Sequence, residues 1–277
     1  MRSNFFFIMI AVLAGVLLQD NAKAGTVLTY NDFSSTSGYG LLGSATQNGN
    51  VLQLTSNTPL NQVGGVFFTS PVDVSSFNAL FTFEFSSGGA GDGLVFVIKN
   101  MNSTGTNSGL GGNGEALGYA DRYGYKGFSN SVGIEFDSHI NPSPVNDISA
   151  NHIGINTNAS VISLVQSNVL SDFNSAIPWH VWVDYDGAVL SVYINQTNIK
   201  PVSASLTGGS SVTPFIIKDY VGSSTGLMGF TASTGGATQI TKLLSFNYNS
   251  PNPEPSTYVL MGVGALIAGM VARRKSV

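Results

Sequence analysis

The sequence predicts an all-β fold, either a sandwich or a barrel, built from many short strands. From Thr26 onward, runs rich in β-branched and aromatic residues alternate with clusters of Gly, Ser and Asn, and the chain holds 33 glycines. Repeated turn signals between short apolar runs are typical of sandwiches and barrels. No stretch between the two chain ends keeps a helical spacing of apolar residues over three turns. An apolar fraction of 43% indicates a packed chain rather than a disordered one.

Nine segments have the composition expected of strands. Ala79–Phe85 has the strictest pattern, because Phe81, Phe83 and Phe85 alternate with smaller or polar residues as in a half-buried strand. Asp186-Gly187 separates two of the segments and predicts a hairpin with a primed turn. The predicted strands are Val63–Thr69, Ala79–Phe85, Gly93–Lys99, Val132–Ser138, His152–Asn156, His180–Tyr185, Val189–Asn195, Gly226–Ala232 and Leu243–Tyr248.

The two ends of the chain differ in character from the body. Residues 1–24 combine Arg2, the apolar run Phe5–Leu18 and the small-residue ending Ala22-Lys23-Ala24, which predicts a secretory signal peptide. Residues 253–277 hold a second apolar run, Tyr258–Ala272, followed by three basic residues. That run predicts a short transmembrane helix whose basic end stays on the cytoplasmic side. Residues 25–252 remain and suffice for a single all-β domain.

The C-terminal segment resembles the PEP-CTERM sorting tail of Gram-negative bacteria. The resemblance is carried by Pro253-Glu254-Pro255, the short apolar run and Arg273-Arg274-Lys275. It implies secretion across the inner membrane, transient anchoring and recognition by an exosortase. Removal of the helix would then deliver the protein to the cell surface or the extracellular polysaccharide matrix. A permanent membrane anchor is the alternative interpretation of the same run.

Charge and cysteine content exclude several classes of function. The body carries six Lys and Arg against thirteen Asp and Glu, without any basic run. It therefore lacks the positive surface that a phosphate backbone requires, which argues against nucleic acid as a partner. The chain has no cysteine, so disulfides, thiolate nucleophiles and Cys-ligated zinc are all excluded.

Acidic residues and a histidine gather in one segment, residues 132–156. Glu135 and Asp137 are two positions apart in a predicted strand, so their side chains share one face, about 7 Å apart at Cα. Asp147 and His152 follow across a loop broken by prolines, without a nearby Lys or Arg. Carboxylates so placed repel one another unless a cation lies between them. Oxygen ligands suit Ca²⁺, and added imidazole suits Mn²⁺ or a similar transition metal. A solvated strand face with an ordinary histidine remains the alternative.

The same segment resembles the metal-binding segment of legume-type (L-type) lectins, and further motifs extend the resemblance over nearly the whole body. The family pattern is Glu-Phe-Asp, an Asn, then Asp followed by His-Ile-Gly-Ile. The matching segments here are Glu135-Phe-Asp137, Asn141, Asp147, His152–Ile155, Gly91–Ile98, Leu110–Gly112, Ala116–Tyr119, Trp179–Gly187 and Gly229–Gly235. The resemblance implies a concanavalin A-like jelly-roll β-sandwich of two large antiparallel sheets.

The resemblance also implies two metal sites that share ligands. The transition metal, Mn²⁺ or another divalent ion, would take Glu135, Asp137, Asp147 and His152. Calcium would take Asp137, the backbone carbonyl of His139, the side chain of Asn141, and Asp147.

The implied carbohydrate site lies beside the calcium. Asp92, preceded by a cis peptide, and Asn141 would bind sugar hydroxyls, and an N–H of the Gly111-Gly112 loop would donate another hydrogen bond. In the family an aromatic residue that stacks on the sugar stands where this chain has His139, so Tyr119 or Tyr123 is expected to substitute. The loop that sets sugar preference corresponds to Gly236, Ala237 and the two residues after them, and it is short and uncharged.

These features predict a non-catalytic lectin that depends on calcium and a transition metal and binds a glycan or exopolysaccharide. Family members often pair through flat sheets, which makes a homo-oligomer a further expectation. One alternative is a structural or adhesive matrix protein that keeps the fold without a working sugar pocket. Another is a glycoside hydrolase of the same fold, which requires two suitably spaced carboxyls. After Glu135-Phe-Asp137 the chain continues Ser138-His-Ile140, without the second Glu of the laminarinase-type pattern.

Overall fold

The computed structural model describes residues 25–250, and strands dominate this part of the chain. The sheet named here the β7 sheet contains β1 (Val27–Tyr30), β3 (Thr46–Asn48), β4 (Val51–Thr55), β7 (Phe77–Gly88), β12 (Trp179–Tyr185), β13 (Leu190–Asn195), β14 (Leu206–Gly208) and β16 (Gln239–Asn249). The sheet named the β9 sheet contains β2 (Tyr39–Gly43), β5 (Val63–Phe68), β6 (Val72–Asp73), β8 (Gly93–Lys99), β9 (Ser131–Asp137), β10 (His152–Thr157), β11 (Val165–Asn168) and β15 (Thr225–Ser233). A 3-10 turn, η1 (Gly114–Ala116), and a short helix, α2 (Ile217–Val221), complete the elements.

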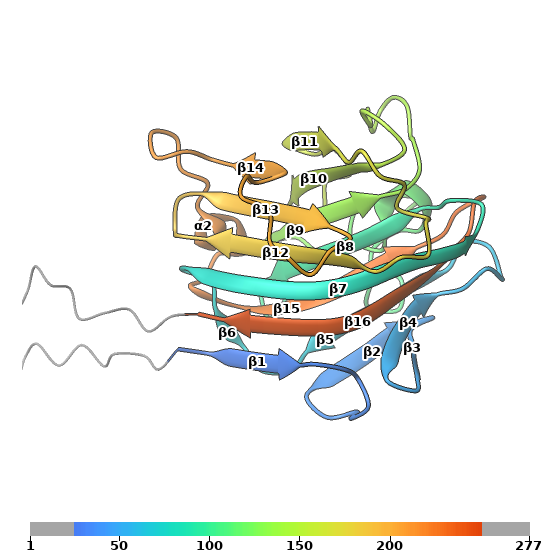
Figure 1. Ribbon diagram of the computed structural model, residues 1–277, viewed down its shortest axis with the longest axis horizontal. Coiled ribbons are helices and arrows are strands. Elements are labelled where there is room, and N and C mark those ends of the chain that lie inside the picture. The colour runs from blue at the N-terminus through green and yellow to red at the C-terminus, as the bar shows by residue number, and fades with distance from the viewer. Residues whose placement is uncertain (1–24, 251–277) are drawn as a thin grey trace, which may run out of the picture. The chain divides into compact units, whose positions relative to one another are not determined.

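Both sheets have eight strands, and every ladder is antiparallel. The β7 sheet runs β14-β13-β12-β7-β16-β4-β3, with β1 also paired to β16. The β9 sheet runs β11-β10-β9-β8-β15-β5-β2, with β6 also paired to β15. In Figure 1, β12, β7 and β16 run side by side, although long stretches of sequence separate them. The predicted sandwich of two large antiparallel sheets is therefore confirmed.

The main hydrophobic core lies between the two sheets and is rich in phenylalanine. Phe81, Phe83 and Phe85 of β7 are all fully buried, as their alternation predicts. Phe81 contacts Phe96 and Phe230 of the β9 sheet, with ring centroids 5.4 and 4.9 Å apart. Aromatic pairs at these separations add about 0.5–1.5 kcal/mol each beyond the burial of apolar area. This packing fixes the β9 sheet, which contains the candidate site, against the β7 sheet.

All nine predicted strands exist, with ends that shift by a few residues. The predicted hairpin joins β12 to β13, where Gly187 has a φ of 99° and the Asp186 side chain accepts hydrogen bonds from the backbone N–H groups of Ala188 and Val189. Sequence patterns missed seven strands, β1 to β4, β6, β11 and β14. Most of these are short or mix exposed and half-buried positions, so they lack a clear apolar alternation.

A second, smaller cluster of buried residues lies on the outer face of the β9 sheet, away from the main core. Val95 and Val97 of β8 pack there against Leu110, Leu117 and Phe128 from the long connection between β8 and β9. The glycine-rich loop predicted from sequence is thus anchored by its own apolar side chains. This anchoring brings η1 to the end of the sheet at which β9 and β10 present their polar residues.

The predicted signal peptide, residues 1–24, and the whole sorting tail, residues 253–277, lie outside the described residues. So does the predicted transmembrane helix. Within residues 25–250, no helix has the length and apolar character needed to cross a membrane.

Candidate metal and carbohydrate site

Strand β9 separates its apolar and acidic residues onto opposite faces. Ile134 and Phe136 belong to the main core, whereas Glu135 and Asp137 point to the outer face, because side chains alternate along a strand. Strand β10 pairs with β9 so that His152 lies opposite Asp137 and Gly154 lies opposite Glu135. The antiparallel register thereby brings the predicted histidine beside the predicted carboxylates.

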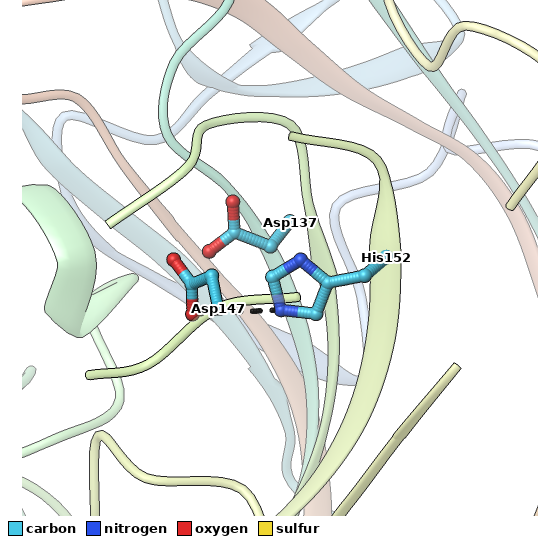
Figure 2. Close-up of side chains that lie close together, drawn as sticks. All are labelled: Asp137, Asp147 and His152. Carbon is cyan, nitrogen blue, oxygen red and sulfur yellow. Dashed lines mark ion pairs between the residues drawn. The ribbon is translucent and has the colours of Figure 1, made fainter. Parts of the chain in front are cut away.

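Three of the predicted metal ligands meet in one compact cluster. Single ligand atoms of Asp137, Asp147 and His152 all lie within 4.8 Å of one another. Figure 2 shows the three side chains converging, with Asp137 on β9, His152 on β10 and Asp147 on the loop between them. The His152 Nε2 atom is 3.7 Å from Asp147 Oδ1 and 3.4 Å from Glu135 Oε1, so Glu135 borders the same cluster.

The His152 ring is oriented by its other nitrogen. Its Nδ1 atom lies 2.8 Å from the Ser149 carbonyl oxygen, which can only accept a hydrogen bond. The Nδ1 atom therefore carries the proton, and the lone pair of Nε2 faces the carboxylates. A histidine held in this way by a backbone carbonyl is the usual arrangement of a metal ligand.

Glu135 is fixed by its own set of neighbours. Asn156 Nδ2 donates to Glu135 Oε2 at 2.7 Å, and the Ser163 hydroxyl donates to Oε1. The opposing residue is Gly154, and a Cβ atom there would lie only 2.3 Å from Glu135 Oε1. The glycine is therefore needed to leave space for the carboxylate.

The cluster concentrates negative charge in a buried place. Burial, and then the neighbouring Glu135 and Asp147, raise the pKa of Asp137 well above its usual range. Burial likewise raises the pKa of Asp147 to about 6. Burial disfavours protonation of His152, but Glu135, Asp147 and the Ser149 carbonyl outweigh it and raise the His152 pKa. Each shift has the sign expected where carboxylates crowd together without a cation.

The loop after β9 links this cluster to Asp92. The backbone N–H of Asn141 donates to Asp147 Oδ2 at 2.6 Å, and the backbone N–H of His139 donates to Asp137 Oδ1 at 2.7 Å. Ser138 lies between Asp137 and His139. Its backbone N–H and its side-chain hydroxyl both donate to the Asp92 carbonyl oxygen, at 2.9 and 3.1 Å. The Gly91–Asp92 peptide is cis, as the sequence resemblance implied.

A pocket of about 380 Å³ lies beside the cluster. Its lining residues are Asn61, Asp92, Asn113, Gly114, Glu115, Tyr123, His139, Asn141, Gly235, Gly236 and Ala237. Five of the residues predicted to bind carbohydrate, Asp92, His139, Asn141, Gly236 and Ala237, are in this set. Burial raises the pKa of Asp92 to about 6, against the opposing effects of His139 and the Gly235 backbone.

Three unpartnered polar atoms coincide with the predicted ligands. In the described part of the chain, Asp92 Oδ1, Asn141 Oδ1, His152 Nε2 and Thr231 Oγ1 are the buried side-chain atoms without a hydrogen-bond partner. The first three belong to this region. Buried polar atoms are rarely left unpaired, so these three indicate a missing partner. Carboxylates with an amide oxygen fit Ca²⁺, and carboxylates with an imidazole nitrogen fit Mn²⁺, so the residues present fit both ions.

The sugar-binding role predicted for Gly111 and Gly112 is wrong, because neither residue lines the pocket. Both are buried, and their N–H groups already donate to the carbonyl oxygens of Gly118 and Ala120, at 2.7 and 2.9 Å. The loop folds back on itself at these glycines, so the next residues, Asn113 and Gly114, reach the pocket instead.

Tyr119 also proves unavailable to a ligand. Its ring is 1% exposed and its hydroxyl is paired with Ser131, whereas Tyr123 lines the pocket. Sequence reasoning missed Asn61, Asn113 and Glu115 altogether. A loop Asn, such as Asn61, carries no local signal of a binding role, because turns favour Asn for conformational reasons.

The chain belongs to a known family: the Legume lectin domain matches residues 26–259. The PEP-CTERM protein-sorting motif matches residues 253–275, which indicates secretion to the cell surface by way of an exosortase. Both resemblances drawn from the sequence are therefore confirmed.

Relatives of this chain include plant proteins. An L-type lectin-domain containing receptor kinase VIII.2 of Arabidopsis thaliana is 29% identical over 261 residues, which cover 87% of this chain and 35% of that protein. The chain thus spans only about a third of such a kinase. A galactose-binding lectin of Arachis hypogaea is 31% identical over 172 residues, covering 58% of this chain and 55% of that one.

Solved structures show the same fold. A structure of peanut lectin with a nine-residue peptide covers 81% of this chain and 97% of its own, at a TM-score of 0.67 and 26% identity. A metal-free form of lectin I-B4 from Griffonia simplicifolia covers 80% of this chain and 98% of its own, at a TM-score of 0.66 and 23% identity.

Proposed function

We propose that this protein is a non-catalytic lectin that binds a glycan or exopolysaccharide at the bacterial cell surface and requires calcium and a transition metal. The observation that carries the proposal is the set of three unpartnered buried atoms, Asp92 Oδ1, Asn141 Oδ1 and His152 Nε2, at one pocket and its adjoining cluster. Membership in the legume lectin family and the galactose-binding peanut relative support it.

The metals are proposed to make the pocket rigid before a ligand arrives. Glu135, Asp137, Asp147 and His152 would hold the transition metal, and Asp137, the His139 carbonyl, Asn141 and Asp147 would hold calcium. The ions would neutralise the crowded carboxylates and fix the loop that carries Asn141. Each sugar hydroxyl replaces a water and gains little net free energy, so ordering the loops during binding would consume the gain.

Within the pocket, the residues have distinct proposed roles. The Asp92 carboxylate accepts hydrogen bonds from sugar hydroxyls, and the Asn141 amide donates one. Asn113 takes the place predicted for Gly111 and Gly112, because it lines the pocket and they do not. Gly236 and Ala237 border the pocket with little bulk, and a Cβ on Gly236 would meet nothing within 4 Å. A side chain at position 236 would therefore fit beside the pocket, and substitution of Gly236 is a means of changing which sugar binds.

A glycan array tests the proposed function. The purified full chain is applied with Ca²⁺ and Mn²⁺ and again after chelation. We expect binding that chelation abolishes, and no release of reducing sugar from the polysaccharides bound. The structural or adhesive alternative predicts no glycan signal under either condition, and the hydrolase alternative predicts release of reducing sugar.

The proposed location has its own test. We expect the protein to cross the inner membrane of a Gram-negative bacterium, to be anchored transiently by its C-terminal segment, and then to reach the cell surface or matrix. Mass spectrometry of the surface-exposed protein should give a chain that lacks residues 1–24 and the C-terminal helix. A chain that keeps its C-terminus would favour the permanent anchor.

A further inference from the structure

Tyr123 is an exposed aromatic residue at the wall of the pocket. Its side chain is 61% exposed, yet it is among the residues that line the pocket. In the described part of the chain, no other lining residue carries a six-membered aromatic ring. A large exposed ring beside convergent polar groups is a common feature of a binding site.

A tight turn holds Tyr123 at this position. Arg122 and Tyr125 exchange both backbone hydrogen bonds, at 3.1 and 2.9 Å. Between them, Tyr123 has a φ of 51° and Gly124 a φ of 81°, the two left-handed conformations of a type I′ turn. Asn or Gly normally occupies such positions, so a tyrosine there is an uncommon choice.

The ring is also held by its hydroxyl group. The Tyr123 hydroxyl donates to Glu115 Oε2 at 2.6 Å, and Arg122 Nε donates to Glu115 Oε1 at 2.6 Å. The Arg122 guanidinium carbon lies 5.2 Å from the centroid of the Tyr123 ring. These contacts fix the ring before a ligand arrives, which lowers the entropy cost of binding.

Gly114 separates the ring from Asp92. A Cβ on Gly114 would lie 3.6 Å from Asp92 Oδ2 and 3.7 Å from Tyr123 Cε2. The missing side chain therefore leaves a gap between a hydrogen-bond acceptor and an aromatic ring. A saccharide presents hydroxyl groups at its edge and C–H groups on its face, which matches this pairing. The negative face of an aromatic ring attracts such weakly positive hydrogens.

We propose that Tyr123 is a specificity-determining residue that packs against the C–H face of an uncharged saccharide while Asp92 binds its hydroxyls. The proposal rests on the lectin function proposed above. An acidic ligand is disfavoured because no Lys or Arg is among the described residues that line the pocket, and Arg122 is already paired with Glu115. An acidic saccharide would meet the Asp92 carboxylate without a lysine or arginine to offset the repulsion.

The test compares the full chain with three variants on an array of neutral and acidic saccharides, followed by calorimetry with the neutral monosaccharide that gives the strongest signal. Tyr123→Asn keeps a residue suited to the turn but removes the ring. Tyr123→Phe keeps the ring without its hydroxyl. Tyr125→Ala is the matched control, because Tyr125 is exposed in the same turn and does not line the pocket.

We expect Tyr123→Asn to weaken binding by about threefold to tenfold, the range of an aromatic contact. Tyr123→Phe should restore most of the affinity, and Tyr125→Ala should match the unaltered chain. In proton NMR, sugar C–H signals should shift upfield with the unaltered chain and Tyr123→Phe, but not with Tyr123→Asn.

Three outcomes would overturn the proposal. Equal affinity and equal upfield shifts for Tyr123→Asn and the unaltered chain would show that the ring does not touch the sugar and would leave the lectin function standing. A preference for acidic saccharides would contradict the uncharged ligand. Absence of binding by the unaltered, metal-loaded chain would overturn the lectin function itself.

Discussion

At the scale of single residues, Asp92 joins the pocket to the candidate metal cluster. Its carbonyl oxygen accepts two hydrogen bonds from Ser138, which stands between Asp137 and His139, while its carboxylate lines the pocket. Only 3% of the residue is exposed, so its negative charge is costly unless a ligand or ion offsets it. A residue with this cost and without a structural partner for Oδ1 is suited to binding.

Replacing Asp92 should separate binding from folding. We expect Asp92→Asn to weaken saccharide binding by about tenfold to a hundredfold, because hydrogen bonds to a charged group contribute about 1.5–3 kcal/mol. The melting temperature at neutral pH should stay level or rise, since a buried charge is removed. Calorimetric titration and thermal melts measure both. Asp184→Asn, on the opposite sheet, is the control, and unchanged binding by Asp92→Asn would contradict the assignment.

At the scale of elements, the pairing of β9 with β10 brings together the predicted metal ligands. The register sets His152 opposite Asp137, and a glycine opposite Glu135 gives that carboxylate its space. Asn156 and Ser163 then hold Glu135 in place. The two strands thus supply three of the four predicted transition-metal ligands, and the loop between them supplies Asp147.

A methyl group at Gly154 should therefore impair the metal site more than the fold. The Cβ of Gly154→Ala would lie 2.3 Å from Glu135 Oε1 and the same distance from Ser163 Oγ, so the carboxylate must move. We expect Mn²⁺ affinity to fall by about tenfold to a hundredfold, as when neighbours that orient a ligand are lost. Isothermal titration with Mn²⁺ measures this. Gly40→Ala is the matched control in β2, where a Cβ meets nothing within 4 Å, and equal affinities for the two variants would refute the expectation.

At the scale of the whole molecule, we expect the cluster to make stability depend on pH and on the proposed metals. The pKa values of Asp92 and Asp147 are about 6 in the folded chain, against 3.8 in their ordinary state. The pKa values of Asp137 and His152 are also raised. Without metal, the folded chain therefore binds more protons than the unfolded chain between about pH 4 and 6. The contribution of Asp92 and Asp147 to stability is complete below that window and is lost as pH rises through it, whereas the contribution of His152 is lost only as pH rises above the ordinary histidine pKa of 6.5.

Chelated protein should accordingly melt at a higher temperature at pH 5 than at pH 7.5. Asp92 alone contributes about 1.4 kcal/mol to that difference, because pH 5 lies about one unit below its folded pKa of about 6 and each unit is worth about 1.4 kcal/mol. Protein loaded with Ca²⁺ and Mn²⁺ should show the opposite trend, because protons compete with metals for the same carboxylates. Scanning calorimetry at both pH values, with and without chelator, checks this. A chelated form that loses stability on acidification to pH 5 would rule out the electrostatic account.

The sequence by itself determined the all-β class, nine of the strands and the chemistry of the β9 segment. Side-chain alternation is a local property of an extended backbone, so Glu135 and Asp137 were placed on one face without knowledge of any partner strand. The order and spacing of the motifs then identified the family. The weakly patterned strands β1 to β3 were missed, because strands with many exposed positions have no apolar alternation to detect.

Only the tertiary structure decided which loops form the pocket. Asn61 lies between β4 and β5, whereas Asn113 and Tyr123 lie in the long connection between β8 and β9, and their meeting depends on strand order and on how that connection folds over the sheet. The same fold turned the N–H groups of Gly111 and Gly112 inward and left Asn113 at the pocket. Convergence of this kind results from long-range packing, whereas a sequence pattern reports only local conformation. The binding surface was therefore set by how the two sheets and their loops pack together.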